Sequence, residues 1–303
     1  MLFLNFPELK LENWIESKIT LHLFLQILGK IRLAYFPPQQ HFWHAPLYVT
    51  ANGITTGPLV HATGLFEIKL DLVKHKCIAI HSNGQSYGFA IEALSVSEFY
   101  QKTVALTQKM GIELVIYAKP YDPSRVRTEM SFIENTQARA YDKEYISRFW
   151  YILTQVYPIL EQFKGAFVTK VSPVFLYWQT LDLGCSIYTG NEIKGVSSAV
   201  HGKVFQQTYS HEMFSIGFWV GDDYLPEPVF YVQANPDYPG LLKYPLFPQG
   251  ARWLGEQEES LMGIFNYQQC IESLDPKQAI RDFFQSGYLA ISQSANWFVE
   301  EVD

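Results

Sequence analysis

The sequence predicts an α+β fold of two similar halves, each made of a helix, an antiparallel sheet and a second helix. Of the 303 residues, 48% are hydrophobic and 17% are charged, which is typical of a chain that folds around a core. Short segments of alternating apolar and polar residues, separated by turn residues, indicate antiparallel strands. The same order of elements occurs twice along the chain, which is consistent with an internal duplication.

The first half, residues 1–120, begins with a helical pattern over residues 12–35. This helix is expected to end at Pro37-Pro38, because proline cannot continue a helix. Strands are expected over residues 46–50, 54–60, 65–73, 77–82 and 87–91, with the clearest alternation in FEIKLDL. Ser95 and Glu98 have the spacing of a capping box at the start of a helix that runs to Met110. The sequence IELVIY at 112–117 predicts one more strand.

The second half, residues 142–303, repeats this order. Helical patterns cover residues 142–163 and 276–298, and Asp275 and Pro276 have the chemistry of a helix start. Strands are expected over residues 174–178, 181–188, 213–220, 229–234 and 261–266, with insertions near 191–210 and 235–258. The segment 121–141 is the expected linker, although the two halves could also form one continuous domain.

Local sequence similarities connect the two halves. HAPLYV around Pro46 resembles SPVFLY around Pro173, and ITTG resembles IYTG. If the halves are duplicates, their sheets should meet along one interface, with these two prolines close together. Ligand sites favour such junctions, so the sequence predicts a pocket there.

Charge and composition exclude several classes of protein. Lys and Arg number 23 and Asp and Glu number 30, a net charge of −7, which argues against a nucleic-acid partner. The most apolar stretch, residues 21–36, contains four polar or charged side chains, so it predicts a packed helix rather than a membrane span. No phosphate-binding glycine motif occurs, and no cofactor is predicted.

The cysteines and the N-terminus indicate the compartment. Cys77, Cys185 and Cys270 are far apart and odd in number, so they do not predict a disulfide framework. The first residues lack the basic region of a secretory signal. We therefore expect a cytoplasmic protein; its oligomeric state is not predicted.

Three motifs show a resemblance to a known family. HFWHAPLYVTANGITTG (41–57), SPVFLYWQTLDL (172–183) and YSHEMFSIGFWVGD (209–222) are similar to those of a bacterial family of about this length that is catalogued only as a domain of unknown function. The matching features run from near Trp14 to near Trp297. The resemblance implies no activity, cofactor or catalytic residue. It implies only that certain residues lie in motif-bearing stretches: His44, Pro46, Ser172, Pro173, Trp178, Asp182, His211 and Glu212.

Four polar residues are the candidates for chemistry. His44 or His211 could act as an acid–base group, with Asp182 or Glu212 as its carboxylate partner. Asp182 lies between apolar neighbours in a predicted strand, where a carboxylate needs a partner, and Lys170 or His211 could supply one. His211 and Glu212 can face the same cleft only if they lie in a loop, because neighbours in a strand point to opposite faces. The simpler alternative is that these groups form structural hydrogen bonds or ion pairs.

Aromatic side chains near the predicted strands could line the pocket. The candidate ligand-binding residues are Trp43, Tyr48, Trp178, Trp219 and Lys170. Tyrosine and tryptophan combine apolar surface with a polar group, which suits a flat ligand. Strand-borne aromatic residues are, however, far more often plain core.

Three functions therefore remain open at this point. The first is a small-molecule pocket at the junction of the halves, with hydrolysis as the least demanding reaction. The second is a non-catalytic protein-interaction module, which predicts no enclosed pocket and a large distance between His44 and His211. The third is a metal-dependent enzyme that uses His41, His44, His211 and Glu212. No close metal signature supports it, since Ser215 stands where H-E-x-x-H needs its second histidine, and no metal ligand is assigned.

Overall fold

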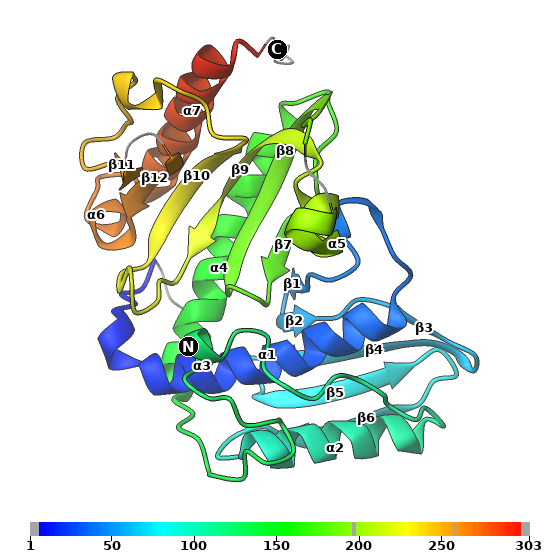
Figure 1. The fold of residues 1–303 in the computed structure, drawn as a ribbon. Helices are drawn as coiled ribbons and strands as arrows, with labels where there is room; N and C mark the ends of the chain where they lie inside the picture. Colours follow the sequence, from blue (N-terminus) through cyan, green and yellow to red (C-terminus); the bar gives the residue numbers. More distant parts are fainter. Residues whose placement is uncertain (1–5, 196–197, 257–258, 298–303) are drawn as a thin grey trace.

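The computed structural model describes residues 6–195, 198–256 and 259–297 and confirms the α+β fold. Over these residues the chain forms seven α-helices and two antiparallel sheets of six strands each. Figure 1 shows the two sheets beside each other, the first in blue to cyan and the second in green to orange. No helix in these ranges is long and apolar enough to cross a membrane.

The first sheet follows the predicted order. Its elements are α1 (Ile15–Tyr35), β1 (Tyr48–Thr50), β2 (Gly53–Thr55), β3 (Leu59–His61), β4 (Gly64–Asp71), β5 (Lys76–His81), β6 (Ser86–Ala90) and α2 (Val96–Lys109). The strands lie in the order β1-β2-β4-β5-β6, and β3 pairs with β4. The capping box of α2 is confirmed, because Ser95 Oγ accepts from the Glu98 N–H and Glu98 Oε2 accepts from the Ser95 N–H. The single strand expected over 54–60 is split into β2 and β3 around Gly57, whose φ is +65°.

The strand predicted over residues 112–117 is wrong. This segment is irregular, and the side chain of Tyr35 satisfies part of its backbone. The Tyr35 hydroxyl donates to the Glu113 carbonyl at 2.8 Å and accepts from the Val115 N–H at 3.1 Å. A side chain thus takes the place of a neighbouring strand in these two bonds.

The second half contains three elements that the sequence did not predict. Its half comprises α4 (Lys143–Gly165), β7 (Phe175–Tyr177), β8 (Asp182–Glu192), α5 (Ser198–Thr208), β9 (His211–Trp219), β10 (Val229–Asn235), β11 (Arg252–Glu256), β12 (Glu259–Asn266), α6 (Tyr267–Ile271) and α7 (Pro276–Ala295). The strand order is β7-β8-β9-β10-β12-β11. The unpredicted α5 and β11 lie in the two insertions, and the unpredicted α6 directly follows β12. The short helix α3 (Pro123–Val126) lies in the expected linker.

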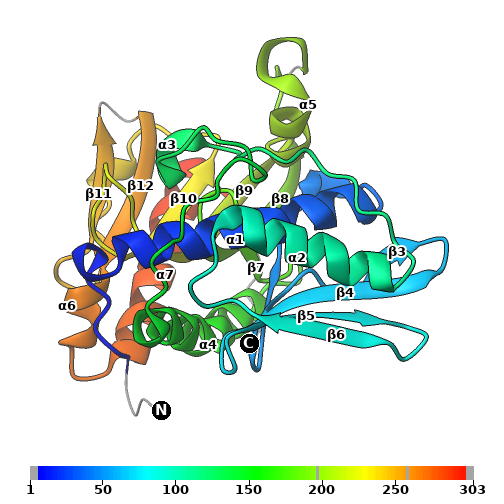
Figure 2. The same cartoon turned by 90° about the horizontal axis from the view of Figure 1, so that it is seen from below.

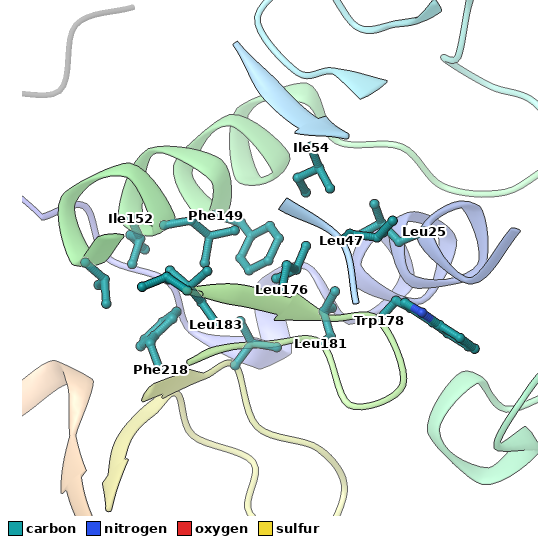
Figure 3. Close-up of a cluster of buried hydrophobic side chains, with 14 of the residues drawn as sticks. Leu25, Leu47, Ile54, Phe149, Ile152, Leu176, Trp178, Leu181, Leu183 and Phe218 are labelled. Carbon is teal, nitrogen blue, oxygen red and sulfur yellow. The ribbon is translucent and has the colours of Figure 1, made fainter. Parts of the chain in front are cut away.

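The halves meet where the sequence predicted. Leu47, next to Pro46, and Leu176, close to Pro173, form an antiparallel bridge and exchange two backbone hydrogen bonds of 2.9 Å. Figure 3 shows side chains from both halves packed around this bridge, including Leu25 of α1 and Phe149 of α4. The two similar sheets are consistent with a duplication, and the division at residues 121–141 stays a prediction.

The two faces of the second sheet have different neighbours. Phe214, Phe230 and Val232 point towards α4 and α7: Phe214 packs on Phe163 of α4, and the other two contact α7. In Figure 2, α4 and α7 lie on one side of this sheet, and α3 and α5 lie on the other. Because side chains alternate along a strand, the odd-numbered residues of β9 and β10 face the side of α3 and α5.

Candidate functional site

A cavity of about 750 Å³ lies on the face of the second sheet opposite α4 and α7. Strands β7, β8, β9 and β10 supply its floor. The loop from His41 to Pro46, the residues Tyr121 and Arg125, and the end of α5 close it from above. The lining therefore comes from the first half, the expected linker and the second half.

Four small residues lie in register on the cavity side of β8 and β9, and two of them, Ser186 and Ser215, line the cavity. Gly184 pairs with Gly217, and Ser186 pairs with Ser215, on the neighbouring strands β8 and β9. The two serine hydroxyl oxygens lie 2.8 Å apart. These side chains leave space above the sheet that larger residues would fill.

Tyr231 of β10 occupies part of this space. A Cβ atom added at Gly184 would lie 2.5 Å from the Tyr231 hydroxyl, and one added at Gly217 would lie 2.6 Å from it. The tyrosine ring therefore lies across two strands, and its hydroxyl donates to Asp182 Oδ2 at 2.7 Å. The paired glycines thus allow a residue of β10 to reach the start of β8.

Asp182 is the carboxylate of the cavity lining. Its Oδ1 accepts a hydrogen bond from the Thr180 hydroxyl, and its Oδ2 accepts the one from Tyr231. Burial raises the pKa of Asp182, and these two hydroxyls offset part of that effect. The sequence had suggested Lys170 or His211 as its partner, but the structure places neutral hydroxyls there instead.

Aromatic rings form the walls around Asp182 and along the cavity. Five of them are Trp43, Tyr177, Tyr188, Tyr209 and Trp219. The Trp219 indole N–H donates to the Thr180 carbonyl at 3.2 Å, which fixes this ring beside the turn that precedes Asp182. Burial, and then the charge of Asp182, raise the pKa of the Tyr209 hydroxyl, so this phenol stays neutral at physiological pH.

A histidine–lysine pair lies at the other end of β8. His41 is 6% exposed, and its ring stacks on Tyr188 with the centroids 4.3 Å apart. Its Nε2 accepts from Lys170 Nζ at 2.6 Å. Burial, followed by the charges of Lys170 and His211, lowers the pKa of His41 to about 4, so the imidazole is neutral at pH 7.

The backbone is strained at both ends of the cavity. His41 and Phe42 have φ of 51° and 63°, and Leu181, next to Asp182, has φ of 61°. Non-glycine residues rarely adopt this left-handed conformation, and it occurs preferentially at functional sites. Among the described residues, three of the seven non-glycine residues with this conformation therefore lie at or next to the cavity.

Arg125 covers one end of the cavity and is held by two acids. Its guanidinium lies 2.9 Å from Asp222 and 3.2 Å from Asp122, and it packs over the Trp219 ring at 6.0 Å. The ion pair to Asp222 attaches the segment 121–127 to the loop after β9. The positive charge of Arg125 is thus already balanced within the protein.

Two lining amides have unused hydrogen-bonding capacity. Gln179 and Asn235 each keep one buried amide atom that has no partner among the described residues. Gln179 precedes the turn at Asp182, whereas Asn235 pairs with Met213 near the Tyr188 end. Both atoms are buried, so a ligand could reach them only if neighbouring side chains moved.

The structure brings some of the predicted site residues together. Trp43, Asp182 and Trp219 line the cavity. Lys170 lies behind its wall, over the rings of Trp43 and Tyr188, and His211 contacts His41 edge-on with the centroids 5.3 Å apart.

Four other predicted residues lie outside the cavity lining. His44 is buried and accepts from the Gln39 N–H, and Tyr48 accepts from Arg32. The Trp178 indole is core and donates to the Ala45 carbonyl.

Glu212 is the fourth residue outside the lining. It accepts from Thr189 and Asn191 at 3.1 and 2.9 Å. Because β9 begins at His211, His211 and Glu212 point to opposite faces of the sheet. These two residues therefore do not share one cleft.

A second cavity of the same volume lies near the N-terminal segment. Leu11, Arg252 and Tyr267 are among its lining residues. Its charged residues Arg127 and Asp223 pair with each other at 2.6 Å and are both about half exposed to solvent. Its lining carboxylates Glu12, Asp223 and Glu227 are all exposed, whereas Asp182 is partly buried, so we assign the candidate site to the first cavity.

The described residues do not form a metal centre. Across 6–195, 198–256 and 259–297, no three His, Cys, Asp or Glu side chains form a group that could hold a metal ion. His41 and His44 have separate partners, as described above. The three cysteines are free and buried.

Sequence reasoning missed the small residues on the cavity side of the second sheet. Gly184, Ser186, Ser215 and Gly217 occur at alternate positions of two predicted strands, which was a usable signal for a face lined by small side chains. Tyr231 gave no such signal, because its role depends on the register of three strands.

The chain belongs to the family of unknown function DUF5996, whose model matches residues 6–303. This match confirms the family resemblance of the three sequence motifs. No curated protein and no solved structure matches the chain.

Proposed function

We propose that the protein binds a small organic molecule in the cavity on the second sheet, with Asp182 as the polar anchor. The observation that carries this proposal is a partly buried carboxylate, held by the hydroxyls of Thr180 and Tyr231, inside a cavity of about 750 Å³. Ligand pockets typically have volumes of about 300–1,000 Å³ and combine apolar walls with a few oriented polar groups. Both properties are present here.

The construction of the cavity further supports binding. Keeping a carboxylate in a desolvated position costs free energy unless another group interacts with it. A packed core would place an apolar residue at Asp182 and larger residues at the small positions of the floor. A site that must accommodate a ligand explains both features.

Native mass spectrometry of the untagged protein, compared with its denatured mass, tests the proposal first. We expect an adduct of one organic molecule, or a rise in melting temperature with at least one member of a metabolite library. Asp182→Asn should abolish the effect. Glu212→Gln is the matched control, because it removes a carboxylate of the same sheet outside the cavity and should leave binding intact. No adduct and no stabilising compound, or equal loss in both variants, would contradict the proposal.

Acid–base catalysis, with hydrolysis as the reaction, is a second candidate function. Burial raises the pKa of Asp182, and a carboxyl group with a raised pKa in a cavity is a candidate general acid or base. The test is turnover of a bound compound: Asp182→Asn should abolish product formation, whereas His44→Ala should leave it unchanged if the protein remains folded. A bound compound that is recovered unaltered would favour binding alone.

We also propose a cytoplasmic location. Its support is that the three cysteines are free and buried, as is usual in a reducing compartment. Fractionation of cells that express the untagged protein at its natural level would test it.

A further inference from the structure

We propose that the ligand of this cavity is an organic cation, whose ammonium group binds Asp182 and whose flat body lies over the serine floor. This inference rests on the proposed function, since it names the chemical class of the ligand. Three features support it: the charge balance of the lining, the aromatic surfaces around Asp182, and the arrangement of the two ends of the cavity.

The charge balance leaves Asp182 without a cation. Both its hydrogen bonds come from neutral hydroxyls, and no Lys or Arg of the described ranges forms an ion pair with it. Arg125 is the guanidinium of the lining, but Asp122 and Asp222 already neutralise it. A ligand that carries a positive charge would supply the missing partner.

The aromatic surfaces suit the same charge. Tyr177 pairs directly with Asp182 across β7 and β8, Tyr231 reaches the carboxylate from β10, and Trp219 pairs with Asp182 from β9. The face of an aromatic ring carries negative potential and attracts ammonium groups, most strongly when water is excluded. The rings that border this carboxylate are of the type that forms aromatic cages for alkylammonium ligands, although the Arg125 guanidinium already lies over the Trp219 ring at 6.0 Å.

The two ends of the cavity determine the orientation of the ligand. Asp182 and Tyr188 both line the cavity and are six residues apart on β8, a separation of about 20 Å at 3.3 Å per residue. Lys170 lies over the Tyr188 ring at 5.4 Å, so a second ammonium group would be repelled at that end. The cation is therefore expected at Asp182, and an uncharged aromatic body towards Ser186, Ser215 and Tyr188.

Three indole compounds of similar size separate charge from shape. Tryptamine carries an ammonium group, tryptophol a hydroxyl and indole-3-acetate a carboxylate. Binding of each to the full chain can be measured by protein-observed NMR or by calorimetry up to millimolar concentration. We expect tryptamine to bind at least about tenfold more tightly than tryptophol, a difference of about 1.4 kcal/mol, and indole-3-acetate to bind most weakly.

Two variants test whether the preference for tryptamine over tryptophol depends on the carboxylate of Asp182. Asp182→Asn should reduce the ratio of tryptamine to tryptophol affinity to less than about twofold, whereas the control Glu212→Gln should keep it. Trp219→Leu keeps the carboxylate and removes one aromatic face, so it should weaken tryptamine more than tryptophol. This second variant keeps the test decisive if Asp182→Asn fails to fold.

The outcomes distinguish this inference from the proposed function. If tryptophol or indole-3-acetate binds as tightly as tryptamine, or if the preference persists in Asp182→Asn, the ligand is not a cation, but the cavity still binds small molecules. If none of the three compounds binds, the cation inference is overturned, and the metabolite library decides the proposed function separately.

Discussion

The position of Tyr231 across Gly184 and Gly217 leads to a quantitative prediction. In Gly184→Ala, the new Cβ atom would lie 2.5 Å from the Tyr231 hydroxyl and 2.7 Å from the Ile216 carbonyl oxygen. Carbon and oxygen atoms cannot approach so closely, so the tyrosine must move. Its 2.7 Å hydrogen bond to Asp182 would then break.

The magnitude follows from two contributions. Overpacking a tight site costs about 1–3 kcal/mol, and a hydrogen bond to a charged group contributes about 1.5–3 kcal/mol. We therefore expect Gly184→Ala to lower the free energy of unfolding by about 3–5 kcal/mol in the wild-type background. In the Tyr231→Phe background the hydroxyl and its bond are absent, so the same substitution should cost about 2 kcal/mol less.

Urea unfolding of the four proteins in this double-mutant cycle gives the coupling energy, provided that their m-values agree. Gly165→Ala is the control, because a Cβ atom added at that glycine has nothing within 4 Å, and its stability should not fall. An equal cost of Gly184→Ala with and without the Tyr231 hydroxyl would refute the proposed role of the glycines.

Three further predictions concern titratable groups. Because burial raises the pKa of Asp182, the folded state binds its proton more tightly than the unfolded state, and ionisation at higher pH removes stability; the free energy of unfolding of the wild type should therefore fall relative to that of Asp182→Asn as the pH rises above about 4 in urea titrations, and a difference independent of pH would contradict the raised pKa. Burial lowers the pKa of His22 to about 4, so the stability this neutral imidazole contributes is present above pH 6.5 and lost towards pH 4; the stability difference between wild type and His22→Gln should change by about 3 kcal/mol across that range in urea titrations. Lys170→Met should raise the pKa of His41 in an NMR titration of the imidazole, because the lysine charge contributes to its lowering, and an unchanged value would contradict the pairing.

The fold was predictable where local chemistry determines it. The capping box at Ser95, the proline stop after α1 and the alternation in FEIKLDL each specify one element, and each is present. The contact between Leu47 and Leu176 was also expected, because similar sequences in two halves predict equivalent places at their junction. A contact between distant parts of the chain could thus be predicted without predicting the order of the strands.

The incorrect predictions of secondary structure concern segments whose conformation depends on partners far along the chain. IELVIY has the composition of a strand, but Tyr35 binds its backbone and Val115 is 70% exposed. β11 escaped prediction because RWLGE is short and lies in a long insertion, and its pairing with β12 is what makes it a strand. Such pairings follow from register and cannot be obtained from a window of a few residues.

In the candidate site, too, some residues could be predicted from local sequence and others could not. Trp43, Asp182 and Trp219 were recognisable as unusual residues in or beside strands, and they line the cavity. His211 and Glu212 were attractive because they are adjacent polar residues, but the period of a strand sends them to opposite faces. Adjacency in sequence was therefore a weaker indication that two residues share a site than their alternation along a strand.

Alternation in β8 and β9 also explains why the cavity lies on this face. In DLGCSIY and MFSIGFW, one set of alternate residues is large and apolar, and packs against α4 and α7, while the other set contains Gly184, Ser186, Ser215 and Gly217. A sheet covered by helices on both faces needs large apolar residues on both. A face of small residues that is bordered by aromatic rings instead predicts a space that something else must fill. Here Tyr231 fills part of it, and the carboxylate that its hydroxyl reaches faces what remains.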